Sequence, residues 1–246
     1  MLTDVGRNGV VSGRTDSPLS EEQVQSYNDN GYLVVENLLP LEECDRLMTI
    51  FEEYADEDYS AILNLDRSEP EIRQLMKQPD IVSRVEQLQG TEVVGLMSQM
   101  LFKKAGSRYA VQAWNPHQDN SYPQAEYGAY ITTNIFFEDA DADNGGMYIY
   151  PGSHKEGLLP YATIKSYREG IGENPGNVVE PPEKYQKIDL VTKKGGMLVL
   201  NGCVVHGSYP NESPERSRPL CQLIYIKRGA NFISGKNANR TAIPLH

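Results

Sequence analysis

The sequence predicts a mainly β protein of the α+β class, in which a β-sandwich or barrel carries flanking helices. Two observations support this prediction. Apolar residues recur at helical spacings over roughly the first ninety residues, and short β-prone runs separated by turn clusters follow. A parallel α/β sheet would instead alternate helices and strands. Because sandwiches and barrels of this size commonly form one unit, we expect a single domain.

The N-terminal part is expected to be helical. Residues 1–17 are polar and aperiodic, which predicts a flexible arm ahead of a domain over residues 18–246. In the helical part, residues 20–90, Ser20 and Gln23 resemble a capping box that opens a short helix, and the run YLVVENL after it is extended. Residues 40–57 have an amphipathic pattern, and further helices are expected at about 69–77 and 79–88, separated at Pro79.

Residues 91–228 form the predicted β core, with turns rich in glycine, proline, asparagine and aspartate between the strands. The loop 155–186 interrupts this core without predicted structure of its own, and the tail 229–246 follows the last strand. A long insertion near a site commonly serves as a lid. Both segments are therefore candidate lids.

The composition argues against two classes of partner. A formal net charge of −11 opposes binding to nucleic acid, whose phosphates need a basic surface. No run approaches the roughly 18–20 apolar residues that span a bilayer, and the N-terminal residues lack the apolar core of a signal peptide, so we expect a cytoplasmic protein without a membrane segment. Cys44, Cys203 and Cys221 lack any CxxC spacing, which argues against a disulfide framework and a thiolate zinc site.

The sequence NPHQDN places His117 and Asp119 two residues apart. In an extended segment both side chains project to the same side, so they can bind one ion, although the spacing alone is a weak signal that also occurs in surface turns. A third ligand must come from the remaining histidines. His246 ends the chain and is expected to fray, and His154 suits a structural role in the turn YPGSH. His206 follows the apolar run MLVLNGCVV and lies at a strand end.

His117, Asp119 and His206 would form a set of two imidazoles and one carboxylate, which leaves adjacent positions open on an octahedral metal. That set is typical of non-haem iron(II) enzymes that activate dioxygen. If 2-oxoglutarate fills two of the open positions, its distal carboxylate needs a buried cation, and Arg216 and Arg218 precede the last strand. The same ligands could hold zinc or manganese in a cupin-like enzyme, because ligand identity alone does not decide the metal.

The order of HQD, then DNGGMYIYPGSHKEGLL, then HGSYPN and a basic pair before a strand resembles the phytanoyl-CoA dioxygenase family of iron(II)- and 2-oxoglutarate-dependent oxygenases, over about residues 20–228. The resemblance implies a double-stranded β-helix, a cupin-like jelly-roll barrel, with iron held by His117, Asp119 and His206. It also implies 2-oxoglutarate and dioxygen as co-substrates, with ascorbate as a candidate reductant.

The resemblance further implies which residues bind 2-oxoglutarate. The family's arginine stands eleven residues after the second metal histidine, but a serine occupies that position here, so either Arg218 or Arg216 takes the role. We prefer Arg218, because the strand after it then keeps the family's register, and we expect Ser208 to assist it. Met100 and Asn134 fall where the family lines the co-substrate. For Asn134, a core position or a contact with the substrate is equally open.

Aromatic side chains near the barrel mouth are expected to surround the substrate. Alternation puts Tyr130, Asn134 and Phe136 on one strand face, and Trp114 and Tyr122 flank the metal motif. About half of these aromatics are expected to be ordinary core, and Trp114 could serve either in packing or as a gate. The residues assigned to the substrate site are Trp114, Tyr122, Tyr130 and Phe136.

The presence of Asp119 favours hydroxylation, because related halogenases leave that ligand position open for chloride. We expect 2-oxoglutarate to be converted to succinate and carbon dioxide while a small organic molecule or natural-product intermediate is oxidised. An acyl-CoA substrate is not expected, since the sequence has no basic cluster for a nucleotide diphosphate. Two alternatives stay open: a cupin-like metalloenzyme that does not use 2-oxoglutarate, and a non-catalytic binding protein on the same fold.

Overall fold

The helical part of the computed structural model, which describes residues 10–12, 19–55, 61–107, 109–164 and 176–246, agrees closely with the prediction. Ser20 Oγ accepts a hydrogen bond from the Gln23 backbone and the Gln23 side chain accepts one from the Ser20 backbone, which completes the predicted capping box. The third and fourth helices each begin with a proline, which suits a first turn because its N–H groups need no partner within the helix. The four helices are α1 (Glu21–Asn30), α2 (Leu41–Tyr54), α3 (Pro70–Met76) and α4 (Pro79–Gln89).

Seven strands form the large sheet: β1 (Val10–Ser12), β2 (Tyr32–Glu36), β3 (Ala61–Leu63), β4 (Val93–Lys103), β6 (Tyr130–Phe136), β11 (Met197–Asn201) and β13 (Arg218–Lys227). Their order across the sheet is β1-β2-β11-β6-β13-β4-β3. All neighbours are antiparallel except β1 and β2, which run parallel. The long strands β6, β13 and β4 lie next to one another, so their alternating side chains form continuous rows across the sheet.

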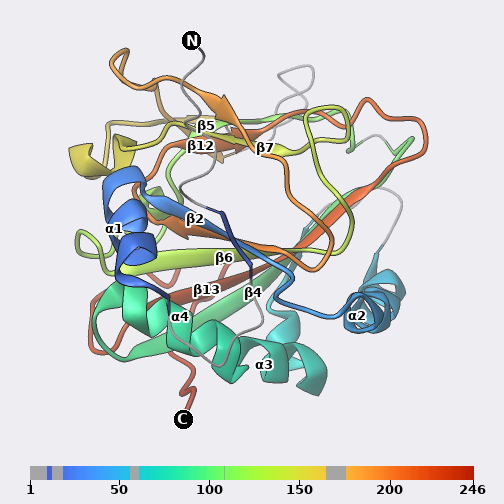
Figure 1. Ribbon diagram of the computed structural model, residues 1–246, viewed down its shortest axis with the longest axis horizontal. Coiled ribbons are helices and arrows are strands. Elements are labelled where there is room, and N and C mark those ends of the chain that lie inside the picture. Colours follow the sequence, from blue (N-terminus) through green and yellow to red (C-terminus); the bar gives the residue numbers. More distant parts are fainter. Residues whose placement is uncertain (1–9, 13–18, 56–60, 108, 165–175) are drawn as a thin grey trace.

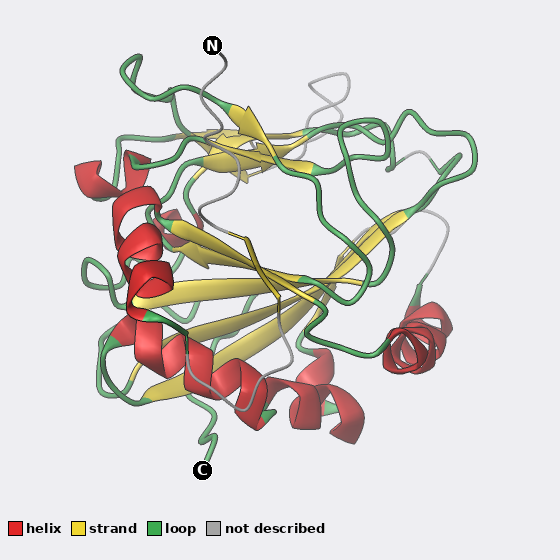
Figure 2. Ribbon diagram, viewed as in Figure 1, coloured by secondary structure: helices red, strands yellow, loops and turns green. Residues whose placement is uncertain are grey.

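The small sheet has the order β10-β7-β12-β5 and faces the large sheet (Figures 1 and 2). Its strands are β5 (Trp114–His117), β7 (Met147–Ile149), β10 (Ile188–Asp189) and β12 (His206–Ser208). Along the chain from β5 to β13, strands of the small and large sheets alternate, except that β7 and β10 both belong to the small sheet. This repeated crossing is the connectivity of a jelly roll. The described residues also form three short 3-10 helices: η1 (Leu65–Arg67), η2 (Asp119–Ser121) and η3 (Ser153–Glu156).

Two apolar clusters lie on opposite faces of the large sheet. One fills the space between the sheet and helices α2, α3 and α4, and includes Phe51, Ile72 and Tyr225. Figure 1 shows α3 and α4 along the face that points away from the small sheet. The other cluster lies between the two sheets and includes Ile149 and Leu198. The inner face of the large sheet is therefore apolar where this second cluster packs against it. The rest of that face is available to line a pocket.

Two predicted segments lie partly outside the described residues. Of the predicted arm, 1–17, only residues 10–12 are described, and they pair with β2. Within the loop 155–186, residues 165–175 lie outside the described ranges, and the flanking residues form a hairpin of β8 (Ala162–Ile164) and β9 (Gly176–Val178), which differs from the structureless loop expected. No helix in the described part of the chain is both long and apolar enough to cross a membrane.

Candidate active site

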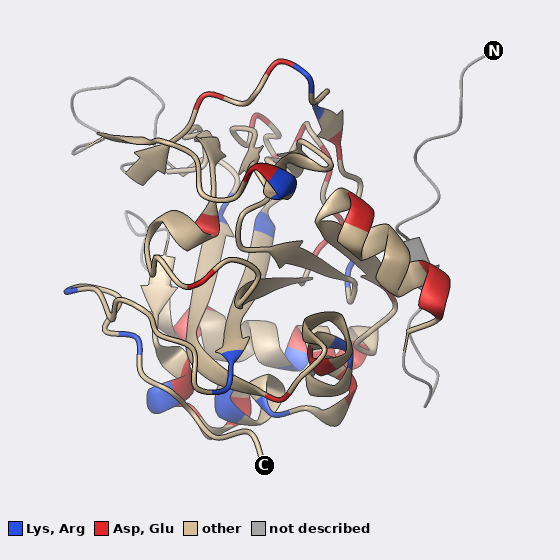
Figure 3. Cartoon of the chain, turned by 90° about the vertical axis from the view of Figure 1, so that its left-hand side faces the viewer, with Lys and Arg blue, Asp and Glu red and all other residues tan. Residues whose placement is uncertain are grey.

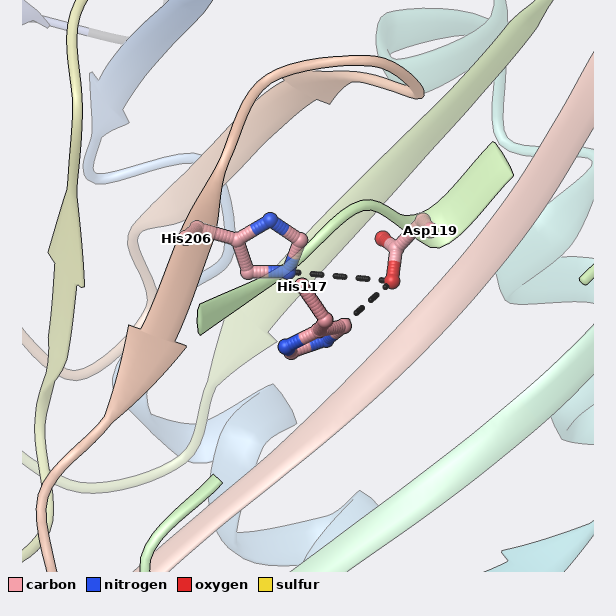
Figure 4. A group of neighbouring side chains, drawn as sticks. All are labelled: His117, Asp119 and His206. Carbon is pink, nitrogen blue, oxygen red and sulfur yellow. Dashed lines mark ion pairs between the residues drawn. The ribbon is translucent and has the colours of Figure 1, made fainter. Parts of the chain in front are cut away.

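Strand pairing brings the three predicted metal ligands together. His117 ends β5, Asp119 begins η2 directly afterwards, and His206 begins β12, where it lies opposite His117. The Oδ1 atom of Asp119 lies 3.6 Å from Nε2 of His117 and 3.7 Å from Nε2 of His206 (Figure 4). Two ligand atoms that are each about 2.0–2.2 Å from a metal can be separated by up to about 4.4 Å. These three donors are therefore close enough to hold a single ion.

Backbone carbonyls select the tautomer of both histidines. Nδ1 of His117 lies 2.8 Å from the carbonyl oxygen of Asn115, and Nδ1 of His206 lies 3.1 Å from that of Val204. A carbonyl can only accept, so each Nδ1 carries the proton and donates it. Each Nε2 is then left with a lone pair that points toward Asp119 and is available to a metal.

The carboxylate of Asp119 is oriented by the large sheet. Thr132 Oγ1 donates to Asp119 Oδ2 at 2.9 Å, and Gln222 Nε2 lies 3.4 Å from the same oxygen. Both contacts use Oδ2, so Oδ1 stays directed at the two imidazoles. Thr132 on β6 and Gln222 on β13 belong to the large sheet, whereas the two histidines lie on β5 and β12 of the small sheet. Both sheets of the jelly roll therefore take part in building the metal centre.

The charge states of the ligands also suit a cation. Burial by itself would raise the pKa of Asp119, but the neighbouring His206 and His117 and the bond from Thr132 outweigh it and lower that pKa to about 2. Burial, together with His117, lowers the pKa of His206 to about 4. At neutral pH the centre thus presents an ionised carboxylate and a neutral His206, which are the forms that bind metal.

Gln118 explains why the two ligands are separated by one residue. Alternation turns its side chain away from the metal centre, where its Nε2 donates to the carbonyl oxygens of Gly157 at 2.8 Å and Cys203 at 2.6 Å. Its Oε1 accepts from the backbone of Leu159 at 2.8 Å. The middle residue of HQD therefore anchors the start of the loop 155–186 and the turn before β12 beside the metal ligands.

The metal ligands open into a pocket of about 450 Å³ on the inner face of β4, β6 and β13. A cationic group lies at one end, where Arg218 faces Lys103 directly across the pairing of β13 and β4. Apolar side chains such as Leu63, Met97 and Ile224 line the other end. The C-terminal tail lines the pocket with Gly235, Asn237, Ala238 and Arg240. Of the residues predicted to bind co-substrate or substrate, those that line it are Trp114, Tyr122, Tyr130, Asn134, Ser208 and Arg218.

Arg218 and Arg216 occupy different environments. Arg218 is 1% exposed, donates from Nε to the carbonyl oxygen of Gly145 at 2.9 Å, and has an Nη1 atom without a hydrogen-bond partner among the described residues. Burial lowers its pKa to about 10, so it stays protonated at neutral pH. Arg216 is exposed and forms two hydrogen bonds with Asp141, each 2.8 Å long. Of these two arginines, only Arg218 can therefore meet an anion in the pocket.

Two predicted residues do not line the pocket. Met100 is 1% exposed and lies in the cluster between the large sheet and the helices, whereas its neighbours Gln99 and Leu101 line the pocket. The expectation was thus off by one residue, which in a strand reverses the face. Phe136 lies on the face of β6 that lines the pocket, but past the end of the pocket. It is fully buried in the cluster between the two sheets. It is core, not a substrate contact.

The other histidines lie outside the metal centre. His154 is 4% exposed, with Nε2 3.0 Å from the carbonyl oxygen of Asn28 on α1, as expected for a structural residue. It also explains Gly31, which follows α1 at a φ of 80°, because a Cβ at Gly31 would lie 2.5 Å from the His154 ring. His246 pairs with Glu86 at 3.1 Å and so is not frayed as expected.

Three residues important to the site were not assigned a role from the sequence. Lys103 is fully buried beside Arg218, and its Nζ donates to Ser208 Oγ at 2.9 Å and to the carbonyl oxygen of Tyr209. Its place at the end of an alternating strand was a usable signal. Gln222 follows Arg218 by four residues, so alternation places both on the same strand face. This spacing was a second usable signal in the sequence. Arg240 lies in the aperiodic tail, and no local pattern pointed to it.

The fold and the site together define a jelly-roll protein with a centre of two histidines and one carboxylate. A family model described as phytanoyl-CoA dioxygenase (PhyH) matches residues 27–220. The chain belongs to this family. Peroxisomal phytanoyl-CoA dioxygenase from Homo sapiens is 23% identical over 220 residues, which cover 79% of this chain and 65% of that protein, slightly less than two thirds of its length.

Solved structures show the same fold. The non-heme alpha-ketoglutarate-dependent epimerase SnoN from nogalamycin biosynthesis superposes with a TM-score of 0.69 at 19% identity, over 85% of this chain and 83% of SnoN. EctD from S. alaskensis, solved with 2-oxoglutarate and 5-hydroxyectoine, has a TM-score of 0.66 at 18% identity, over 89% of this chain and 80% of EctD. The predicted jelly-roll fold is confirmed by these similarities.

Proposed function

We propose that the chain is an iron(II)- and 2-oxoglutarate-dependent oxygenase that hydroxylates a small organic molecule and converts 2-oxoglutarate to succinate and carbon dioxide. One observation carries this proposal: His117, Asp119 and His206 converge beside a buried arginine, Arg218, whose Nη1 has no hydrogen-bond partner among the described residues. Membership in the phytanoyl-CoA dioxygenase family supports it.

The residues present fit both groups. Two imidazole nitrogens and one carboxylate oxygen are the donor set typical of non-haem iron(II) oxygenases. Arg218 would bind the distal carboxylate of 2-oxoglutarate through its free Nη1, because a guanidinium matches the planar shape of a carboxylate. The Ser208 hydroxyl lines the pocket and supplies a further donor, and the buried Lys103 ammonium contacts this hydroxyl at 2.9 Å.

When bound, iron(II) and 2-oxoglutarate supply the oxidising power drawn from dioxygen. The chain contributes placement and exclusion of water. Thr132 and Gln222 hold Asp119 so that a single carboxylate oxygen faces the imidazoles. Trp114 lies against His117 with ring centroids 5.7 Å apart, and its Nε1 donates to Tyr109 at 2.9 Å, which keeps a broad apolar surface beside the metal ligands. The tail over the pocket restricts access of solvent to a reacting C–H bond.

The type of reaction and the substrate class belong to the proposal. SnoN is described as an epimerase and EctD was solved with a hydroxylated compound, so this fold accommodates more than one outcome. An aspartate at position 119 favours hydroxylation over halogenation, which needs that ligand position for a halide. A natural-product intermediate suits the size of the pocket better than an acyl-CoA, and Figure 3 shows Lys and Arg positions interspersed with Asp and Glu instead of gathered for a nucleotide diphosphate. A reducing, cytoplasmic location is consistent with three buried, unpaired cysteines, Cys44, Cys203 and Cys221.

Anaerobic titration with iron(II) and then 2-oxoglutarate tests the proposal. Wild-type protein should develop the weak visible charge-transfer band of a chelated complex, and the band should be absent in Asp119→Ala. Iron binding without a 2-oxoglutarate band would favour the cupin-like metalloenzyme instead. Protein that binds no divalent metal, and whose biological role survives loss of Asp119, would favour a non-catalytic binding protein.

A further inference from the structure

A second arginine reaches the pocket from the C-terminal tail. Arg240 is 8% exposed and lies among the residues that line the pocket. Its Nη1 is 3.4 Å from the carbonyl oxygen of Ile233 and 3.3 Å from that of Ser234, and it is hydrogen-bonded to the Tyr130 side chain. Its Nε is buried without a hydrogen-bond partner among the described residues. The proposed reaction gives this guanidinium no role.

The two arginines lie on opposite sides of the metal ligands. Two side chains that contact Asp119, Gln222 on β13 and Thr132 on β6, mark the position of the metal centre, and Thr132 pairs with Ile224. Arg218 precedes Gln222 by four residues on β13, whereas the pair of Ile226 with Tyr130, beside Arg240, lies two residues beyond Ile224. At about 3.3 Å per residue, the Arg218 backbone lies about 13 Å before Gln222 along the strand, and the pair beside Arg240 lies about 7 Å beyond Ile224, in the opposite direction. An anion held by Arg240 would therefore not compete with one held by Arg218.

The position of Arg240 is set before any ligand binds. The tail is anchored by a pair of hydrogen bonds between Gly95 and Ile243, and by Asn64 Nδ2, which donates to the carbonyl oxygen of Ala238 at 3.0 Å. Gly235 allows the close approach of the guanidinium, because a Cβ there would lie 2.9 Å from Nη1. These contacts give a rigid cationic group at the wall of the pocket, which reduces the entropic cost of binding a ligand.

The charge of Arg240 is not balanced locally. In the described part of the chain no carboxylate forms an ion pair with it, whereas exposed cations nearby in sequence do have one, such as Arg228 with Glu92 at 2.9 Å. A buried cation is costly to desolvate unless an anion or strong acceptors compensate it. Carbonyl oxygens partly satisfy Nη1, but Nε remains free to donate to a ligand. Apolar residues Met97 and Ile224 line the same end of the pocket.

We propose that Arg240 binds an anionic group of the organic substrate, so that the substrate is a small carboxylate with an apolar or aromatic body. This inference rests on the proposed function, in which Arg218 takes 2-oxoglutarate. The substrate carboxylate would lie against Arg240, and its apolar body would extend along Met97 and Ile224 toward the metal ligands. The two arginines at opposite ends of the pocket would then bind different anions, Arg218 the 2-oxoglutarate and Arg240 the substrate carboxylate.

A matched pair of probes tests this proposal. Protein is loaded with zinc(II) and N-oxalylglycine, an unreactive analogue of 2-oxoglutarate that occupies the Arg218 end. It is then titrated with 3-phenylpropanoate and, separately, with 3-phenylpropanamide, and binding is followed by the emission of Trp114, which lines the pocket and is the single tryptophan. Wild-type protein should bind the carboxylate about tenfold more tightly than the amide, the gain expected for charge-assisted hydrogen bonds.

Variants separate recognition of charge from a structural role of Arg240. Arg240→Gln should bind both probes with equal affinity, whereas Arg228→Gln, which removes the same charge outside the pocket, should keep the wild-type preference. If Arg240 only locked the tail, Arg240→Gln would weaken both probes by the same factor and preserve their ratio, and that result would overturn the proposal. Equal binding of the two probes by wild-type protein, or binding of neither, would overturn it as well.

A further measurement needs no variant. Crystals of the wild-type protein with zinc(II) and N-oxalylglycine, soaked in bromide, should show anomalous scattering beside the Arg240 guanidinium, and bromide sites elsewhere with none there would count against the proposal. Failure of the proposed function is a different result. In that case wild-type protein would lack the iron and 2-oxoglutarate band, whereas Arg240→Gln should develop the band as wild type does.

Discussion

His206 lies directly opposite His117 in the antiparallel pairing of β12 with β5. Two of the three metal ligands are therefore positioned by backbone hydrogen bonds of one sheet. The register shifts at the next residues, where Ser208 pairs with Trp114, so a bulge follows the ligand pair. Because β12 keeps a regular register with β7, the extra residue of this bulge lies in β5, and Ser208 lines the pocket on the same strand face as His206 by alternation.

Replacing either histidine should abolish metal binding. In His117→Ala and His206→Ala the affinity for iron(II) should fall by more than the roughly 10- to 100-fold that loss of an outer partner costs, because a direct ligand is removed. Anaerobic calorimetry measures this loss. His154→Ala is the matched control, since that buried histidine contacts the carbonyl oxygen of Asn28 and not the metal centre. Unchanged affinity in His206→Ala would remove this residue from the ligand set.

Thr132→Val should weaken metal binding without removing a ligand. The substitution keeps the shape of the side chain but deletes the hydrogen bond to Asp119 Oδ2, so the carboxylate loses its main orienting contact. We expect a 10- to 100-fold lower affinity for iron(II). The control is Thr133→Val, because Thr133 faces the other side of β6 and donates to the carbonyl oxygen of Leu223 at 3.2 Å. Equal losses in the two variants would show that the effect is one of folding.

The metal ligands could be predicted from the sequence because local rules determine them. The HxD spacing places two side chains on one side of an extended chain, and a glycine-bounded apolar run puts His206 at a strand end. Met100 could not be assigned correctly in the same way, since a one-residue error in strand register reverses the face. Arg240 owes its role to contacts between segments far apart in the chain, and no local pattern describes such contacts.

Arg218→Gln should weaken 2-oxoglutarate binding while Arg216→Gln should not. Arg218 is buried with a free Nη1, and removing one partner of a buried charge pair typically costs at least about thirtyfold in affinity. Arg216 already pairs with Asp141 at the surface. Titration of each iron-loaded variant, followed by the charge-transfer band, measures the difference. A larger effect from Arg216→Gln would assign the co-substrate to the other arginine.

Lys103→Met should lower the affinity for 2-oxoglutarate about tenfold and leave iron binding unchanged. Burial, aided by the neighbouring Arg218, lowers the pKa of Lys103 well below its ordinary value. A dicarboxylate beside it would favour the charged ammonium, so binding should take up a proton at any pH at which the free protein holds the neutral amine. Calorimetry in two buffers of different ionisation enthalpy detects this uptake. It should be absent in Lys103→Met and present in Lys104→Met, which removes the adjacent exposed lysine.

His154 should make stability depend on pH at a distance from the metal centre. Burial lowers the pKa of His154 below 6.5, more than its bond to the carbonyl oxygen of Asn28 raises it, so the folded protein holds the neutral ring. Below about pH 6.5 the unfolded chain takes up a proton that the folded chain resists, and stability present above this pH is lost as the pH falls. Urea unfolding of wild type and His154→Gln, which can still donate to Asn28, measures this. The advantage of wild type over the variant should shrink between pH 7.5 and pH 5, and a constant difference would mean that His154 titrates normally in the fold.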